Sequence, residues 1–249
     1  MSNSAGVWRG MRLRRIGVVR TISELVLVGA IVLIAATRPS PAVMWRGKVV
    51  YRVATREKVV ALTFDDGPYP VYTQQILDIL DQCHVKATFF MIGKNMETHP
   101  EIVRDVVKRG HVIGNHTYDH PKNLELGTQA QVVRELDSCE QVIERLTGSR
   151  AHLFRPPRGL IDGGVLMIAD AEGYCTVLWS VCVDHRAAAT PELMAQRVLE
   201  RNVRGAIVLV HDGGCFTRWK DVAVTPILIE RFRKRGYRFV TVPELLKMR

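Results

Sequence analysis

Two adjacent carboxylates, Asp65 and Asp66, stand directly before Gly67-Pro68. The apolar run 58–62 ahead of them predicts a short buried strand, and Gly67-Pro68 must end it. Neighbouring side chains on an extended chain point to opposite sides. We therefore expect Asp65 and Asp66 to have separate roles and not to form one shared acid pair. A strand that ends in an Asx-type turn, without chemistry, is the alternative at this point.

Two histidines four residues apart, His116 and His120, form a second group of candidate ligands. They follow a strand-like run at 112–113 and a glycine. One turn of the backbone would bring their ring nitrogens to a single point. Together with one carboxylate from Asp65 or Asp66, they would hold an ion such as Zn²⁺ and leave positions for water and substrate. The sequence therefore predicts a divalent metal site.

Three more polar stretches also follow strand-like runs: residues 155–159, 179–185 and 209–213. In the first, two prolines fix the backbone around Arg155 and Arg158. A rigid surface loop with solvated arginines is the alternative there, and a loop cap is the alternative for His211. In a parallel barrel the strand ends share one face, where barrel enzymes keep their active sites. All five stretches are thus expected to converge.

The chain between these stretches alternates short apolar runs with helical patterns. Strands are expected at 49–53, 59–62, 87–91, 112–113, 152–154, 174–178, 206–210 and 237–240. Helices are expected at 73–82, 100–109, 129–146, 163–172, 191–202 and 221–235. Such alternation predicts an α/β fold with a parallel sheet, closed or nearly closed as a barrel. A doubly wound open sheet is the alternative.

Residues 1–41 have the layout of an export leader. They hold six arginines and one acid, Glu24, and so carry half of the chain's formal net charge of +10. The apolar run 25–36 is shorter than the ~20 residues that a spanning helix needs and suits a signal peptide. We expect an exported protein, tethered to the membrane or released, with a connector at 42–56 and one domain at 57–246. A buried or amphipathic amino-terminal helix is the alternative.

The five cysteines are odd in number, widely spaced and without a Cys-x-x-Cys pair, which speaks against a disulfide framework or a thiolate metal site. The basic charge by itself would fit nucleic-acid binding. No recognition motif accompanies it, and half of it lies in the leader. Anionic wall polymers or lipid headgroups are the expected partners of the surplus arginines, and nucleic acid is not.

Residues 63–68, 116–120, 155–159, 179–185 and 209–212, in this order, resemble the five motifs of the polysaccharide deacetylase family. This family is also known as the NodB homology domain or carbohydrate esterase family four. The resemblance spans about residues 57 to 246. It implies a distorted (β/α)7 barrel. It also implies metal-dependent removal of N-acetyl, sometimes O-acetyl, groups from sugar polymers such as peptidoglycan or chitin.

The resemblance also implies a role for each matching residue. Metal ligands would be Asp66, His116 and His120, with zinc as the expected ion and cobalt or another divalent ion as alternatives. Asp65 would be the general base and His211 the general acid. Arg155 would orient Asp65, and Asp184 would orient His211. The backbone N–H of Arg158 would receive the oxyanion, and the substrate-binding set would include Pro157 and Trp179.

Two departures from the family pattern concern the substrate groove and the packing around the acid His211. Arg158 stands where the family usually has an aromatic residue. The fourth motif reads Cys182 and Asp184-His185, where the family usually has a further Asp and ends in Asp-Trp. The alternatives are a membrane-tethered glycan-binding protein without turnover and a metal-dependent amidohydrolase acting on another amide or O-acetyl substrate. Retention of Asp65 and His211 favours an enzyme, because a binding protein needs neither base nor acid.

Overall fold

The computed structural model describes residues 49–183 and 190–248, which belong to one compact unit of the chain. The predicted leader 1–41 lies outside the described residues, as do Asp184 and His185. Within the described ranges, no helix is both long and apolar enough to cross a membrane.

The strands form one sheet whose pairings are all parallel. Its order is β1-β6-β5-β4-β3-β2-β8-β7, with β9 paired to β2. The bounds are β1 Val49–Val50, β2 Val59–Gly67, β3 Thr88–Met91, β4 Val112–Asn115, β5 Leu153–Phe154, β6 Cys175–Val177, β7 Val181–Cys182, β8 Ala206–His211 and β9 Arg238–Phe239. Every expected strand is present, whereas β7 was missed because a two-residue strand leaves no period in the sequence.

The helices follow the strands in the expected alternation. Their bounds are α3 Tyr72–Gln82, α4 Gly93–Thr98, α5 Pro100–Lys108, α6 Gln129–Thr147, α7 Gly163–Ala171, α8 Pro191–Leu199, α9 Trp219–Lys234 and α10 Val242–Leu246, with 3₁₀ turns η1 Leu124–Leu126 and η2 Pro157–Gly159. Thr128 and Gln131 form a capping box at the start of α6, and Gly148 ends it in the left-handed conformation. The unpredicted α4 and α10 are short, so they leave a weak periodic signal.

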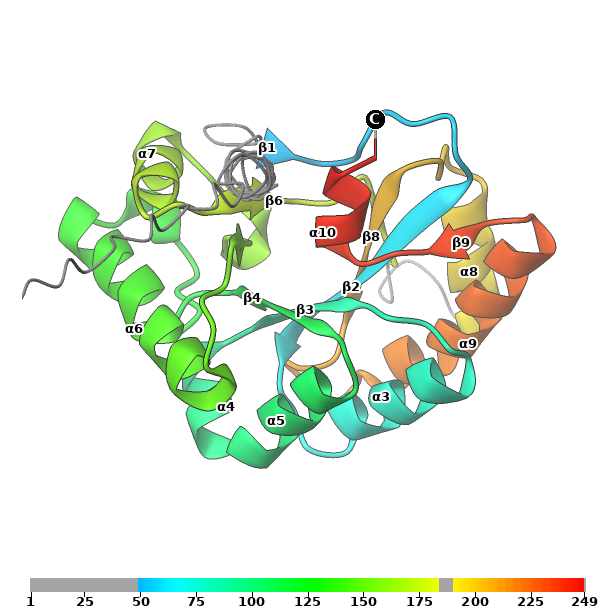
Figure 1. Cartoon of the computed structure of the whole chain (residues 1–249), viewed down its shortest axis with the longest axis horizontal. Helices are drawn as coiled ribbons and strands as arrows, with labels where there is room; N and C mark the ends of the chain where they lie inside the picture. The colour runs from blue at the N-terminus through cyan, green and yellow to red at the C-terminus, as the bar shows by residue number, and fades with distance from the viewer. Residues whose placement is uncertain (1–48, 184–189, 249) are drawn as a thin grey trace, which may run out of the picture. The chain divides into compact units, whose positions relative to one another are not determined.

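The sheet curls into a distorted barrel with the longer helices around its outside, as expected (Figure 1). Among the described strands, β1 and β7 end the pairing path and are not paired to each other. The barrel is thus not closed between these two strands, but the curl of the sheet, with the longer helices around its outside, distinguishes it from the doubly wound alternative. Because β2 pairs with both β3 and β8, the strand that carries Asp65 and Asp66 lies in the middle of the sheet.

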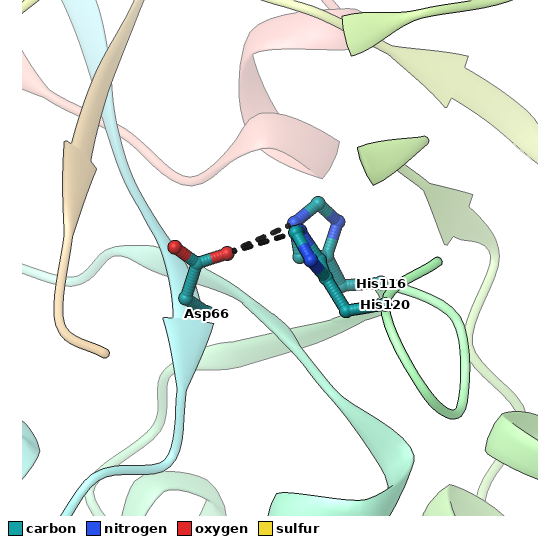
Figure 2. A group of neighbouring side chains, drawn as sticks. All are labelled: Asp66, His116 and His120. Carbon is teal, nitrogen blue, oxygen red and sulfur yellow. Dashed lines mark ion pairs between the residues drawn. The ribbon is translucent and has the colours of Figure 1, made fainter. Parts of the chain in front are cut away.

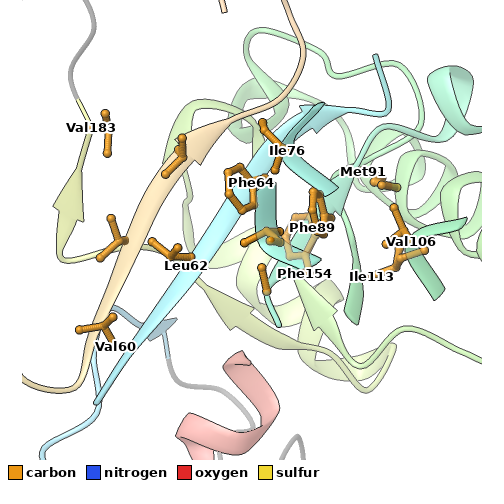
Figure 3. Close-up of a cluster of buried hydrophobic side chains, with 14 of the residues drawn as sticks. Val60, Leu62, Phe64, Ile76, Phe89, Met91, Val106, Ile113, Phe154 and Val183 are labelled. Carbon is orange, nitrogen blue, oxygen red and sulfur yellow. The ribbon is translucent and has the colours of Figure 1, made fainter. Parts of the chain in front are cut away.

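Alternation along β2 separates two apolar clusters. Val60, Leu62 and Phe64 belong to the large cluster between the sheet and the helices (Figure 3). Val59 and Ala61 belong to the smaller inner cluster, which includes residues of α10. By the same two-residue period, Thr63 and Asp65 follow Val59 and Ala61 on the inner side. The packing of β2 thus aims Asp65 into the barrel.

A buried histidine, His111, lies between α5 and β4 in the outer layer. Its Nδ1 accepts a hydrogen bond from the backbone N–H of Ala87 at 3.1 Å. The ring meets the Phe89 ring edge-on, with centroids 5.5 Å apart. Burial lowers the pKa of His111 to about 4. The folded protein therefore holds this ring neutral at pH values where an unfolded chain would already protonate it.

Acidification is expected to destabilise the protein partly through His111. Between pH 6.5 and about 4, the unfolded chain binds a proton at this ring that the folded chain does not, so stability falls as pH falls through this window. The contribution is about 3 kcal/mol at most. His111→Asn offers an oxygen in place of Nδ1, and its urea midpoint should change less between pH 7.5 and pH 5 than that of the parent. His152→Gln, at an exposed position, is the matched control; an equally steep pH dependence in His111→Asn would contradict the prediction.

Candidate functional site

Three potential ligand atoms meet where β2 ends beside the loop that follows β4 (Figure 2). The Oδ1 atom of Asp66 lies 3.4 Å from Nε2 of His116 and 3.3 Å from Nε2 of His120. All three ligand atoms lie within 4.8 Å of one another. The carboxylate that joins the two histidines is thus Asp66 and not Asp65.

This spacing fits a divalent ion. Zn²⁺ binds imidazole nitrogen and carboxylate oxygen at about 2.1 Å, which sets neighbouring tetrahedral ligand atoms about 3.4 Å apart. The two measured distances from Asp66 match that separation. Two nitrogens and one oxygen also form a donor set that suits zinc and related transition metals. Asp66, His116 and His120 could therefore hold such an ion with at least one position left open.

The ring of His116 is fixed in the form that a metal ligand needs. Its Nδ1 lies 2.6 Å from the backbone carbonyl of Arg155, so Nδ1 carries the proton and donates it to that oxygen. Nε2 faces Asp66: in the neutral ring it carries the lone pair that a metal would take, and in the protonated ring it donates to the Asp66 carboxylate. The ring is buried, which also keeps it from turning toward solvent.

The charge state of Asp66 suits the same role. Burial acts to raise its pKa, but the hydrogen bond to His116 and the nearby histidines outweigh burial and hold the pKa of Asp66 well below its usual value. The carboxylate is therefore ionised at neutral pH, as a ligand must be to bind a cation.

Asp65 points into the barrel and pairs with Arg155. The guanidinium Nη1 donates to Oδ1 of Asp65 at 2.6 Å and to the hydroxyl of Thr63 at 2.9 Å. The rest of the Arg155 fork donates to the carbonyls of Val177 and Leu178, both at 3.0 Å. Burial raises the pKa of Asp65, and the Arg155 charge acts against it. A carboxylate held this way can serve as a base whose direction is fixed by a fully buried arginine.

His211 lies opposite Asp65, because the register of β2 and β8 pairs these two residues. Its backbone N–H donates to Oδ1 of Asp221, a buried residue of α9, at 3.3 Å. Sequence reasoning missed Asp221, since a single acid in the first turn of a helix is ordinary. The predicted partner Asp184 lies outside the described residues.

One pocket of about 190 Å³ gathers most of the predicted site. Its lining includes Asp65, Asp66, His116, His120, Arg158, Trp179 and His211, together with Leu209 and Arg218. Arg155 supports Asp65 from behind. Pro157 is buried at the start of η2 and is not among the described residues that line this pocket. The five stretches that sequence reasoning singled out thus meet on one face of the barrel.

Backbone strain is concentrated at the same place. Six described residues other than glycine have positive φ, and four of them are Asp66 (75°), Thr117 (66°), His120 (55°) and Arg158 (59°). A residue other than glycine keeps a positive φ only where contacts with the surrounding structure hold it there, and such residues cluster at functional sites. Contacts with the rest of the barrel therefore hold the loops of the site in backbone conformations that their residues disfavour.

Arg218 is a second residue at the site that sequence reasoning did not single out. It is buried, its Nε donates to the carbonyl of Gly213 at 2.8 Å, and its Nη2 lies 3.5 Å from Oδ2 of Asp66. Its Nη1 lies 3.7 Å from Oδ2 of Asp221. Gly214 lets this loop approach, because a Cβ there would lie 2.5 Å from Oδ2 of Asp66. Arg218 thus contacts the Asp66 oxygen that does not face the histidines.

Arg218→Gln is expected to weaken divalent metal binding roughly 10- to 100-fold, the usual cost of losing a partner that orients a ligand. Removing a positive charge near a cation would by itself strengthen binding, so the direction of the change separates positioning from charge. A chelator competition titration on metal-free protein measures it. Arg158→Gln removes a charge from the same pocket without touching a ligand and is the matched control. Equal or tighter binding in Arg218→Gln would contradict the prediction.

Comparisons with known proteins agree with this geometry. A family model described as polysaccharide deacetylase matches residues 52–177. A peptidoglycan-N-acetylglucosamine deacetylase of Bacillus cereus is 41% identical over 203 residues, which cover 81% of this chain and 94% of that protein. The family-model match includes Asp65, Asp66, His116, His120 and Arg155 and ends before the strand that carries His211.

Solved structures show the same barrel. The crystal structure of a peptidoglycan N-acetylglucosamine deacetylase in complex with 4-naphthalen-1-yl-N-oxidanyl-benzamide has a TM-score of 0.78 and 32% identity, over 85% of this chain and 98% of that one. A pseudoenzyme of carbohydrate esterase family four from Bacillus anthracis has a TM-score of 0.74 and 28% identity, over 80% and 69%. The fold thus serves both active and inactive relatives. By its family-model match and its 41% identity to a relative that it covers almost completely, this chain belongs to the polysaccharide deacetylase family.

Proposed function

We propose that this protein is a metal-dependent hydrolase that removes N-acetyl groups from the amino sugars of peptidoglycan. The observation that carries the proposal is the meeting of a three-ligand cluster, a buried base candidate and His211 around one pocket. Relatives named as peptidoglycan deacetylases support the choice of substrate. Chitin-like polymers carry the same N-acetyl group and are the second substrate to be tested.

The proposed chemistry uses the two sides of the pocket. Asp65 accepts a proton from the attacking water as the new C–O bond forms at the acetyl carbon. His211 donates a proton to the amide nitrogen as the C–N bond breaks, which releases acetate and a free amine. Arg155 holds Asp65 through Nη1, at 2.6 Å. The backbone N–H of Arg158, on a loop fixed by two prolines, is proposed to donate to the carbonyl oxygen as it becomes negative.

Zinc is the proposed ion, held by Asp66, His116 and His120. When bound, such an ion polarises the acetyl carbonyl and makes water a usable nucleophile at neutral pH. The nitrogen-rich donor set supports zinc over magnesium or calcium, which prefer oxygen ligands. Cobalt fits the same ligands and is the second ion to be tested.

Export is proposed because the substrate polymer lies outside the cell membrane. The arginine-rich start and the apolar run 25–36 support an export leader, whether cleaved or kept as a membrane tether. The proposed catalytic domain is 57–246, preceded by a connector at 42–56. Protease protection in intact cells, with the mass of the mature chain, tests both the side of the membrane and leader removal.

Acetate release from N-acetylated chitooligosaccharide and from peptidoglycan tests the function. The full chain is stripped of metal, assayed, and assayed again after addition of zinc or cobalt. Metal-dependent release from peptidoglycan is the expected result. Metal binding without release from either polymer would favour the glycan-binding alternative. Release only from a small amide or an O-acetyl ester would favour the other amidohydrolase alternative.

Arg158→Tyr is expected to reduce the preference for acidic over neutral glycans. The Arg158 side chain is exposed at the pocket and donates to the carbonyl of Lys122 at 3.3 Å, so it presents a positive charge to the substrate. The change should be roughly two- to fivefold, the size of an exposed ion pair of up to ~1 kcal/mol. The ratio of kcat/KM for a carboxylate-bearing and a neutral oligosaccharide measures it. An unchanged ratio would show that Arg158 does not select charge.

A further inference from the structure

Exposed apolar side chains gather in two loops at one edge of the barrel. Of the eight large apolar residues exposed on the described part of the chain, four are Tyr69 (37%), Val71 (61%), Phe216 (80%) and Trp219 (53%). The other four lie on β1, α5, η1 and α7, or directly beside them. We call Tyr69, Val71, Tyr72, Phe216 and Trp219 the aromatic rim.

The rim is held together by specific contacts. The Tyr72 hydroxyl donates to the backbone carbonyl of Phe216, which joins the two loops. The rings of Tyr69 and Tyr72 stack with centroids 5.5 Å apart. Val71 has a φ of 74°, a conformation that a β-branched residue adopts only under constraint. These contacts fix the residues of the rim relative to one another, so the rim is an ordered surface and not a set of unrelated loop residues.

The rim borders the candidate site. Its two loops follow β2 and β8, the neighbouring strands that carry Asp65 and His211. Between Phe216 and Trp219 the chain turns Arg218 inward, where its Nη2 lies 3.5 Å from Asp66. One short segment thus lines the pocket with Arg218 and exposes aromatic rings on either side of it.

A polymer substrate must extend beyond this pocket. The volume of about 190 Å³ is below the ~300–1,000 Å³ of sites that enclose a whole drug-sized ligand. Sugar units next to the reacting one would therefore lie on the surface around it. A pyranose ring has an apolar C–H face, which packs well on an exposed aromatic ring.

Resting on the proposed deacetylase function, we infer that the aromatic rim binds sugar units of the same glycan chain beside the reacting N-acetyl sugar. Phe216 and Trp219 provide the contact surface, and Tyr72 fixes the loop that carries Phe216. The rim makes the enzyme prefer long glycans over short ones.

Chain-length dependence tests the rim. The parent and Phe216→Ser/Trp219→Ser are assayed with N-acetylated chitooligosaccharides of two and of five sugars. The kcat/KM ratio of the five-sugar to the two-sugar substrate should fall roughly tenfold in the double variant, mainly through KM, which corresponds to one or two lost aromatic contacts. Leu126→Ser removes another exposed apolar side chain, on η1, and is the matched control. Tyr72→Phe should lower the ratio in the same direction by a smaller factor.

Two further measurements keep the outcomes distinct. Titration calorimetry measures binding of the five-sugar substrate to the metal-free parent and to the metal-free double variant. Binding should be weaker in the double variant even if no substrate is turned over. Binding with the rim dependence but without turnover would overturn the proposed function alone. Turnover with an unchanged length ratio would overturn the rim inference alone. Loss of binding to anionic phospholipid vesicles, with an unchanged ratio, would instead identify the rim as a membrane contact.

Discussion

Asp65→Asn is expected to lower kcat for acetate release by roughly 10²- to 10⁴-fold, the usual contribution of a positioned base. The amide keeps an oxygen for the Arg155 Nη1 hydrogen bond, which measures 2.6 Å in the parent, but it cannot accept a proton from water. Metal affinity should stay close to that of the parent, because the ligand cluster contains Asp66 and not its neighbour. Acetate release and a chelator competition titration measure the two properties separately.

The buried guanidinium makes a folding control necessary for this variant. Asp65→Asn leaves Arg155 buried without its anion, and breaking a buried ion pair by removing one partner can cost about 3–5 kcal/mol. Thermal unfolding of each sample shows whether the assayed protein is folded. A folded variant that keeps more than a tenth of the parent rate would show that Asp65 is not the base. Lost metal binding in Asp65→Asn would show that the two carboxylates share one role.

His120→Gln is expected to abolish metal-dependent activity and to weaken metal binding by more than the ~10- to 100-fold that loss of an orienting partner costs. The side chain of His120 is 26% exposed, whereas that of His116 is 2% exposed, so His120 can be changed with less damage to packing. Added metal raises the unfolding temperature of a protein that binds it. Zinc should therefore stabilise the parent strongly and His120→Gln weakly.

The exposed His152 provides the control for this prediction. His152→Gln should keep both zinc affinity and the zinc-induced rise in unfolding temperature, because it lies outside the cluster. Activity that survives metal stripping in the parent would contradict the metal-dependent mechanism altogether. Parent-like zinc binding in His120→Gln would show that His120 is not a ligand.

Much of the candidate site could be predicted because its residues sit where strands end. The Asp65–Asp66 pair and the four-residue spacing of His116 and His120 can be recognised in the local sequence. In a parallel barrel the carboxyl ends of the strands lie on one face, so these residues are expected to meet. The two carboxylates have separate partners, as expected, but the two-residue period does not place Asp66. The register of β2 shifts there and Asp66 has a φ of 75°, so both carboxylates line the same pocket. Bounds of the longer helices differ from the expected ones by only a few residues, since their apolar faces and end signals agree.

What sequence reasoning missed depends on contacts between distant segments. Arg218 and Asp221 stand in no strand-end motif, and only the folded loop brings Arg218 to Asp66 and Asp221 to the backbone of His211. Spacing alone allowed either Asp65 or Asp66 as the third ligand; the family resemblance implied Asp66, and the ligand-atom distances agree with it. Short elements such as β7 and α10 depend on tertiary packing, and they are too short to leave a periodic pattern in the sequence.

The positive φ values at Asp66, Thr117, His120 and Arg158 bear on protein engineering. Each such residue costs on the order of 1–3 kcal/mol, which the remainder of the barrel must offset. Glycine adopts this conformation without the penalty, so a screen for heat resistance alone would tend to collect glycine at these four positions. Those variants would be more stable to heat than the parent, but they would lack the side chains of the site. Selection for a more durable catalyst should therefore hold these positions constant and vary the helical layer.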